Sequence, residues 1–266
     1  MLRGIEAGRR VIRLGGPEAR EFLQDLVTND VGPATGDRAV YAALLTPQGK
    51  YLADFFVLED AAGEGMLVDA AAEQAQGLAQ RLALYRLRRK IPIEDAGLSV
   101  AVVWGEAPEA WPEGVRAVED PRGEGLGWRL YGEAPLAAVG AEAAEAAEWD
   151  ARRVAFGVPE AGVELTPDTY VLEAGFERLN GVDFRKGCFV GQEIVARMKH
   201  KSELRKGLVR VRVEGEAEPG TALETAEGKA AGTLYTVAGG EGLAHLRFDR
   251  AKGPLTAGAA RVTLAE

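Results

Sequence analysis

The stretch KGCFVGQE, residues 186–193, contains the only cysteine in the 266 residues of the chain. A lone cysteine is often a small buried hydrophobe, so a packing role for Cys188 is one interpretation. The neighbouring residues favour a second interpretation. Arg185 and Lys186 are cations that stabilise a thiolate if their side chains converge on it, and the two glycines of the stretch are typical of a tight loop. The run QEIVARM that follows is helical in pattern, and the N-terminal dipole of a helix also favours an anion.

The charge of the chain is uneven around this stretch. The net charge is −9, but the segment from Arg185 to Arg212 carries nine Lys or Arg residues against two Glu, a local charge of +7. A basic segment on an acidic protein suits the docking of an anion. It is equally typical of a solvated face whose partners lie elsewhere in the fold. The overall acidity predicts that direct nucleic-acid binding is not the function.

Composition and missing motifs exclude several classes of protein. A single cysteine excludes an internal disulfide framework and an iron–sulfur cluster held by four local cysteines, and the two histidines make a protein-only zinc site a poor fit. There is no Walker loop, and no Gly-x-Gly-x-x-Gly follows a strand pattern. The N-terminus lacks a signal-peptide pattern, and no uncharged apolar run reaches the ~20 residues that cross a bilayer. These features predict a cytoplasmic protein with no membrane partner, in which Cys188 can supply one ligand of a cluster shared with another protein.

Hydrophobic periodicity divides the chain into an α+β part and an all-β part. We expect helices at about residues 17–27, 72–89 and 135–156, and strands at 40–46, 51–60, 66–70, 98–104 and 125–132. The first two strands form a hairpin across PQGK, and residues 105–125 form a surface loop. Strands, a helix and further strands indicate a split βαβ unit. From Leu208 onward, short strands punctuated by glycine indicate a small barrel or sandwich.

Residues 186–193 resemble the hallmark of the YgfZ family, Lys-Gly-Cys-aromatic-x-Gly-Gln-Glu. Three further tracts match that family in the right order, namely RVAFGVP at 153–159, NGVDF at 180–184 and VAR at 195–197. Upstream, VTNDV at 27–31 and GKYLADF at 49–55 resemble tracts that the family shares with the glycine-cleavage T-protein, an aminomethyltransferase. The chain is thus similar to the YgfZ family over nearly its whole length.

The T-protein itself is the closest competitor. LEAG at 172–175 resembles the T-protein more than the YgfZ family. The T-protein lacks the cysteine, however, and carries an Asp-Asp pair where this chain has Ala53 and Asp54. The choice between the two relatives therefore depends on Cys188, Gln192 and the lone Asp54.

The resemblance implies an α+β, T-protein-like fold of three modules around a central channel. A discontinuous folate-binding module would comprise residues 1–45 and 132–203. A ferredoxin-like module would comprise residues 46–131, and a C-terminal β-barrel residues 204–266.

The resemblance also implies a ligand, tetrahydrofolate or a derivative, in the central channel. At positions that match the family's, Asp54 and Glu173 would accept hydrogen bonds from the pterin edge, and Arg185 and Arg197 would meet the anionic glutamate tail. The alternative for each carboxylate is a polar residue on a solvent-facing surface. Arg86 and Arg88, in YRLRRK, are a second basic candidate, which otherwise complements the dipole of the preceding helix.

The function that the resemblance implies is a folate-binding accessory protein for iron–sulfur cluster assembly or repair, including in tRNA-modifying enzymes. Cys188 would be the functional cysteine and the one ligand that the chain gives to a transient cluster shared with an iron–sulfur partner, and Lys186 would keep its thiolate poised. Two alternatives stay open. A tetrahydrofolate-dependent aminomethyltransferase of the glycine-cleavage type would lose activity in Asp54→Asn and keep it in Cys188→Ala. A tRNA-docking protein would use the basic segment.

Overall fold

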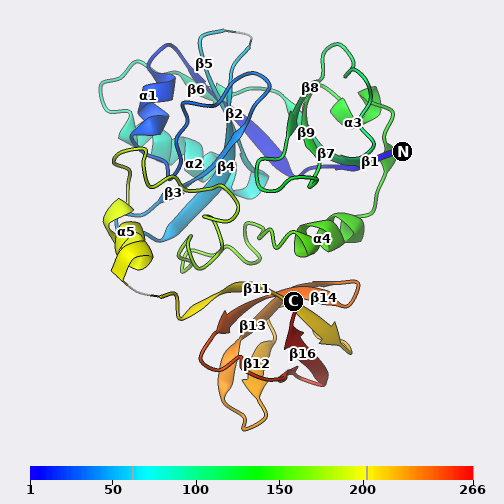
Figure 1. Cartoon of the computed structure of the whole chain (residues 1–266). Coiled ribbons are helices and arrows are strands. Elements are labelled where there is room, and N and C mark those ends of the chain that lie inside the picture. The colour runs from blue at the N-terminus through cyan, green and yellow to red at the C-terminus, as the bar shows by residue number, and fades with distance from the viewer. Residues whose placement is uncertain (62, 202, 266) are drawn as a thin grey trace. The chain divides into compact units, whose positions relative to one another are not determined.

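The computed structural model describes residues 1–61, 63–201 and 203–265 of the chain, and Figure 1 shows its elements. The chain forms two compact units. The first comprises Met1–Ala144 and Glu177–Gln192, and the second comprises Glu145–Phe176 and Glu193–Glu266.

The first unit contains an antiparallel sheet in the order β3-β4-β5-β2-β6. Its strands are β3 (Val40–Leu45), β4 (Tyr51–Glu59), β5 (Gly65–Ala71), β2 (Arg9–Gly15) and β6 (Ile93–Asp95). Helices α1 (Ala19–Gln24) and α2 (Ala72–Tyr85) bury their apolar residues in the same core as this sheet, because Phe22, Leu78 and Leu82 belong to one cluster with strand residues such as Phe55.

A second sheet in the same unit has the order β10-β1-β7-β9-β8. Its strands are β10 (Glu142–Ala143), β1 (Leu2–Glu6), β7 (Ser99–Gly105), β9 (Trp128–Gly132) and β8 (Arg116–Glu119). All neighbours pair antiparallel except β1 and β10, which are parallel. The short helix α3 (Pro135–Ala138) contributes Leu136 to the small core on this sheet.

The second unit is built on a closed barrel in the order β11-β14-β13-β12-β15-β16. The strands are β11 (Lys206–Glu214), β14 (Glu241–Arg247), β13 (Ala230–Ala238), β12 (Ala222–Thr225), β15 (Leu255–Ala257) and β16 (Ala260–Leu264). Alternate residues such as Val211 and Val213 face one interior cluster, as the period of a strand requires. Helix α4 (Ala146–Ala155) packs against β13 and β14, and α5 (Gln192–Lys201) precedes the barrel.

The structure confirms the α+β class, the hairpin and the C-terminal barrel. The hairpin turns at Gly49, whose φ is +75°. It is closed by a hydrogen bond of 2.8 Å that the Thr46 amide donates to the Lys50 carbonyl. The helix expected at 72–89 ends at Tyr85, because Leu87 leaves the helical region with φ +51°. The loop expected at 105–125 contains β8.

The single helix expected at residues 135–156 is wrong. Gly140 adopts φ +62°, which ends α3, and β10 then pairs with β1 before α4 begins. The alanine-rich composition of this region suits a helix, but pairing with an existing strand edge overrides that propensity. The division into three modules stays a prediction, and its boundary at residue 45 falls within the β3–β4 hairpin. In the described ranges, no helix combines the length and apolarity needed to cross a bilayer.

Candidate functional site

Cys188 is exposed, in a loop that is anchored on its N-terminal side by Lys186. The Lys186 Nζ donates hydrogen bonds to the carbonyl of Gln24 and to that of Val27, the latter at 2.6 Å. Gln24 is the last residue of α1, where helix carbonyls lack backbone partners and favour a cation, and Val27 lies three residues beyond it. Two residues before the thiol, the loop is thereby attached to residues 24–27 at and just beyond the end of α1.

The C-terminal side of the loop is fixed by Gly191 and Gln192. Gly191 adopts φ +82°, and a Cβ there would lie 2.6 Å from the Thr46 carbonyl oxygen, so only glycine fits against the β3–β4 turn. The Gln192 Nε2 donates to the Gly187 carbonyl at 3.1 Å, which closes the loop across Cys188. Phe189 is buried next to the thiol. The loop therefore holds an exposed sulfur between two fixed ends.

The electrostatics of Lys186 follow from this anchoring. Burial lowers the pKa of Lys186 from 10.5 to about 8, although the charges of Asp30, Asp25, Asp183 and Cys188 act in the opposite direction. The direct contacts of the ammonium go to backbone carbonyls. Lys186 thus positions the loop, and its predicted effect on the Cys188 thiolate stays a prediction that rests on proximity.

Asp54 lies on β4 and is only 2% exposed, so the solvent-facing alternative is wrong. Its Oδ2 accepts from the Tyr41 hydroxyl at 3.0 Å and its Oδ1 from the Tyr51 hydroxyl at 2.6 Å. Burial and the Asp54 charge both raise the pKa of these two tyrosines well above the ordinary value, so they stay protonated donors. Both carboxylate oxygens of Asp54 are occupied by protein hydrogen bonds.

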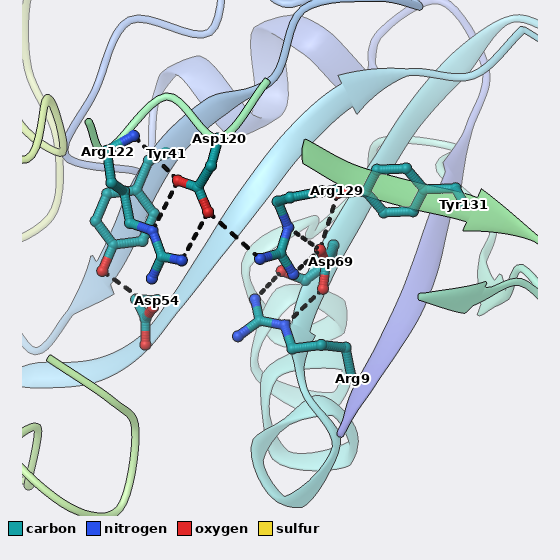
Figure 2. Close-up of polar contacts among 8 residues, drawn as sticks. All are labelled: Arg9, Tyr41, Asp54, Asp69, Asp120, Arg122, Arg129 and Tyr131. Atoms are coloured by element: carbon teal, nitrogen blue, oxygen red, sulfur yellow. Dashed lines mark hydrogen bonds and ion pairs between the residues drawn. The ribbon is translucent and has the colours of Figure 1, made fainter. Parts of the chain in front are cut away.

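A buried charge network, which the sequence did not suggest, lies beside Asp54 and is drawn in Figure 2. Asp69 on β5 is fully buried. It accepts from the Arg9 Nε at 2.6 Å, from the Arg129 Nε and Nη2 at 2.9 and 2.7 Å, and from the Tyr131 hydroxyl at 2.9 Å. Because Arg129 and Tyr131 lie on β9, Asp69 links the two sheets of the first unit.

The network extends through Asp120 to the tyrosine that holds Asp54. Asp120 accepts a bidentate pair from Arg122 at 2.9 and 2.7 Å and lies 3.6 Å from the Arg129 Nη1. The Arg122 guanidinium lies 5.4 Å from the centroid of the Tyr41 ring (Figure 2). Two buried aspartates, Asp69 and Asp120, are thus paired with three arginines, Arg9, Arg122 and Arg129. The network reaches Asp54 only through the Tyr41 ring, against which Arg122 lies. The sequence does contain one signal for this network: each of two apolar strand runs includes a charged residue, Asp69 in MLVDA and Arg129 in WRLYG, and the two charges are opposite.

Glu173 belongs to the second unit and is 8% exposed. Its Oε2 lies 3.3 Å from the Lys206 Nζ and 3.5 Å from the His245 Nε2. Burial raises the pKa of Glu173, but His245 and Lys206 outweigh burial and leave the pKa below its ordinary value. The solvent-facing alternative is therefore wrong for Glu173 as well. Asp54 and Glu173 lie in different units.

The two predicted anion-binding arginines are exposed and already face carboxylates. The Arg185 Nε lies 3.3 Å from the Asp183 Oδ1, with 91% of the Arg185 side chain exposed. The Arg197 Nη2 lies 2.9 Å from the Glu193 Oε1, one turn earlier on α5. Exposed pairs of this kind are weak, so either cation can exchange its partner for an anionic ligand. In the part of the chain that the structure describes, no group of three or more His, Cys, Asp or Glu side chains is arranged to hold a metal ion.

Comparison with known proteins places the chain in a family. Residues 205–266 match the C-terminal β-barrel domain of CAF17. The iron–sulfur cluster assembly factor IBA57, mitochondrial, of Homo sapiens is 34% identical over 93% of this chain and 78% of its own length, and that of Mus musculus is 33% identical with the same coverage. The chain belongs to the IBA57 family.

The solved structure of the glycine cleavage system aminomethyltransferase T from Bartonella henselae shares the fold of this IBA57-family chain. It superposes with a TM-score of 0.80 over 100% of this chain and 85% of its own, at 16% sequence identity. The predicted T-protein-like fold is confirmed by this match, and the predicted YgfZ kinship becomes membership of the IBA57 family. The prediction of a cytoplasmic location is wrong, because the relatives are named mitochondrial.

Two tracts that suggested the kinship have structural roles in this IBA57-family fold. Arg153 of RVAFGVP is 3% exposed, and its guanidinium pairs with Glu164 at 3.0 Å and donates to the Thr236 hydroxyl, which ties α4 to the barrel. Thr28 of VTNDV is fully buried, and its hydroxyl donates to the Gly181 carbonyl at 2.6 Å. Thr28 thereby holds the segment that leads into the cysteine loop.

Proposed function

We propose that the chain is an iron–sulfur cluster assembly factor in which Cys188 supplies the one protein ligand for a cluster shared with a partner. The observation that carries the proposal is the exposed thiol between the anchored ends of its loop. The names of the IBA57 relatives support a role in iron–sulfur cluster assembly.

The chemistry requires little beyond a positioned thiolate. Iron in these clusters is bound by cysteine thiolates, so Cys188 gives up its proton to solvent as the Fe–S bond forms. One cysteine leaves the remaining ligand positions of the cluster to the partner or to small thiols. The cluster is thus cargo, and an exposed, fixed sulfur can enter and leave its coordination shell without unfolding of the loop. Supply of clusters to tRNA-modifying enzymes that contain them would follow from the same step.

Folate binding is the second part of the proposal, and the two candidate carboxylates differ in their fit. Both oxygens of Asp54 accept tyrosine hydrogen bonds, so a pterin edge would have to displace a buried hydroxyl. Glu173 fits better, because its two cation contacts among the described residues are both made to Oε2. We infer that Glu173 accepts from the pterin. When bound, folate supplies a redox-active, one-carbon-carrying ring.

The folate assignment is tested with Glu173→Gln. The substitution should weaken tetrahydrofolate binding in calorimetry about tenfold or more, because one charge-assisted hydrogen bond is lost. Unchanged affinity would contradict the assignment.

An aminomethyltransferase activity has weaker support. The likeness to the Bartonella henselae enzyme is one of fold, at 16% identity. The chain presents a single Asp54 held by tyrosines, and it adds an exposed cysteine that a folate-dependent transfer does not require.

The test of the cluster proposal uses purified chain under anaerobic conditions with iron, sulfide and glutathione. Cluster transfer to apo-aconitase is followed by the recovery of aconitase activity. The matched control is Cys188→Ala combined with Ser99→Cys, which keeps one exposed thiol in the chain but moves it to β7. We expect transfer by the native chain and loss in both variants. Full transfer by Cys188→Ala would refute the role of the cysteine, and transfer by the relocated thiol would refute the role of the loop.

A further inference from the structure

The C-terminal end of α2 presents two leucines to solvent. Leu84 is 73% exposed and Leu87 is 87% exposed, the highest value for a large hydrophobic side chain among the described residues. A single exposed leucine needs no explanation, but Leu84 in the last turn of α2 and Leu87 two residues beyond its end expose two large apolar side chains within four residues of chain. Leu82, on the opposite face of α2, is fully buried in the core of the first sheet. Leu84 and Leu87 do not belong to that core.

The backbone at Leu87 is strained. Its φ is +51°, and among the described non-glycine residues only Asn180 shares a positive φ. Asparagine tolerates this left-handed region, whereas a leucine there is uncommon and raises the free energy of the folded state. Glycine or asparagine would satisfy the turn. The strained position therefore carries a side chain that does nothing for folding and is displayed to solvent.

Cations surround the two leucines. Arg81, Arg88 and Lys90 are exposed, and within the described ranges none of their side chains makes a hydrogen bond or ion pair. Residues 74–93 contain no Asp or Glu. Two other arginines of the segment are used internally: Arg86 donates to the Ile91 carbonyl at 2.8 Å and Arg89 to the Asp25 carboxylate at 2.8 Å. We call Arg81, Leu84, Leu87, Arg88 and Lys90 the leucine patch.

The leucine patch is anchored on the same turn of chain as the cysteine loop. Lys186 bonds to the carbonyls of Gln24 and Val27, and Arg89 bonds to Asp25 between them. Cys188 lies two residues beyond Lys186, and Arg88 lies next to Arg89. The path through these contacts limits the Cα separation of Cys188 and Arg88 to roughly 35 Å, of the order of the width of one standard protein interface.

We propose that the leucine patch docks an acidic protein that exchanges the cluster with Cys188; this inference rests on the proposed function. Three unpaired cations on a chain of net charge −9 select a negatively charged surface, and the leucines require an apolar recess in it. The shared anchor at residues 24–27 places the docked partner within reach of the thiol. Binding to a lipid surface would not require the leucine patch to lie near Cys188, so the arrangement favours a protein as the partner.

Leu87→Gly is the most informative variant, because structure and function predict opposite effects. Glycine relieves the strained φ, so Tm should rise by roughly 2 °C. Removal of the apolar side chain should weaken docking. Arg88→Glu with Lys90→Glu reverses the charge, and Lys252→Glu, at an exposed cation of the second unit, is the matched control outside the leucine patch. The probe is apo-aconitase, with its binding to the full chain measured by interferometry and cluster transfer measured separately.

We expect Leu87→Gly to be more stable than the native chain and to bind apo-aconitase at least tenfold more weakly, with the charge-reversal variant weaker still and the control unchanged. Native-like binding and transfer by Leu87→Gly would overturn the inference, as would failure of the native chain to bind. Binding that depends on the leucine patch, together with transfer that does not need Cys188, would retain the leucine patch and refute the proposed function. Adsorption to anionic phospholipid vesicles that Leu87→Gly abolishes, with transfer in solution unchanged, would assign the leucine patch to lipid and overturn the inference.

Discussion

Replacement of Asp69 by asparagine tests whether the buried charge network holds the first unit together. The substitution keeps the size of the side chain and removes its charge. Arg129, whose side chain is 3% exposed, is then left with Asp120 at 3.6 Å as its nearest carboxylate among the described residues. Breaking a buried pair by neutralising one partner costs about 3–5 kcal/mol of unfolding free energy. For a protein of this size that corresponds to a fall in Tm of roughly 10 °C.

The matched control is Asp95→Asn on β6. Asp95 pairs with Arg10 at 3.0 Å, but their side chains are 56% and 64% exposed, and a pair of this kind is worth about 0–1 kcal/mol. Urea unfolding monitored by circular dichroism compares the two variants. The network account also predicts that Asp69→Asn combined with Arg129→Met costs less than the sum of the single changes. A loss in Asp69→Asn no larger than in Asp95→Asn would refute the reasoning.

The same carboxyl predicts a pH dependence. Burial raises the pKa of Asp69, but Arg129 and Arg9 outweigh burial, so the folded-state pKa lies below the unfolded one. The Asp69 charge therefore adds stability above the unfolded pKa of about 3.9, and that stability is lost as the pH falls through the folded value. Asp69→Asn should flatten this part of the acid unfolding curve.

Three further predictions concern the cysteine loop of the first unit. Lys186→Met should lower the unfolding free energy by about 1–2 kcal/mol, because the Gln24 and Val27 carbonyls lose their donor. The freed loop should also make Cys188 react faster with an alkylating reagent, and an unchanged alkylation rate would contradict the anchoring. Because the folded pKa of Lys186 is about 8 against an ordinary 10.5, the native chain should gain stability between these pH values and Lys186→Met should not, as urea titrations at pH 7.5 and 10 would show. Gly191→Ala should fold poorly, as its Cβ would meet the Thr46 carbonyl at 2.6 Å; an unaltered Tm would exclude that clash.

The parts of the fold that follow from local pattern were predictable from the sequence. The β3–β4 hairpin and the C-terminal run of short strands combine strand-like patterns with glycine turns, and the hairpin and a barrel appear in those regions, although β12 and β15 of the barrel were not predicted. The region 135–156 was not predictable, because β10 exists only by pairing with β1, which precedes it by about 140 residues. No local signal encodes a contact of that range.

The candidate site divides in the same way. The motif around Cys188 identified the loop, but its resemblance could not show that Lys186 bonds to the backbone carbonyls of Gln24 and Val27. The burial of Asp54 depends on Tyr41 from the neighbouring strand, and the burial of Asp69 depends on Arg129 from another sheet. Such partners are brought together by topology, so they become visible only in the folded chain.

The most direct test of the central claim is complementation of cells that lack their own IBA57-family protein, with aconitase activity as the readout. The native chain is compared with Cys188→Ala and with the variant in which the thiol is moved to position 99, all at matched expression. The account predicts that only the native chain restores aconitase activity. Equal restoration by Cys188→Ala would contradict it and remove the cysteine loop from the mechanism.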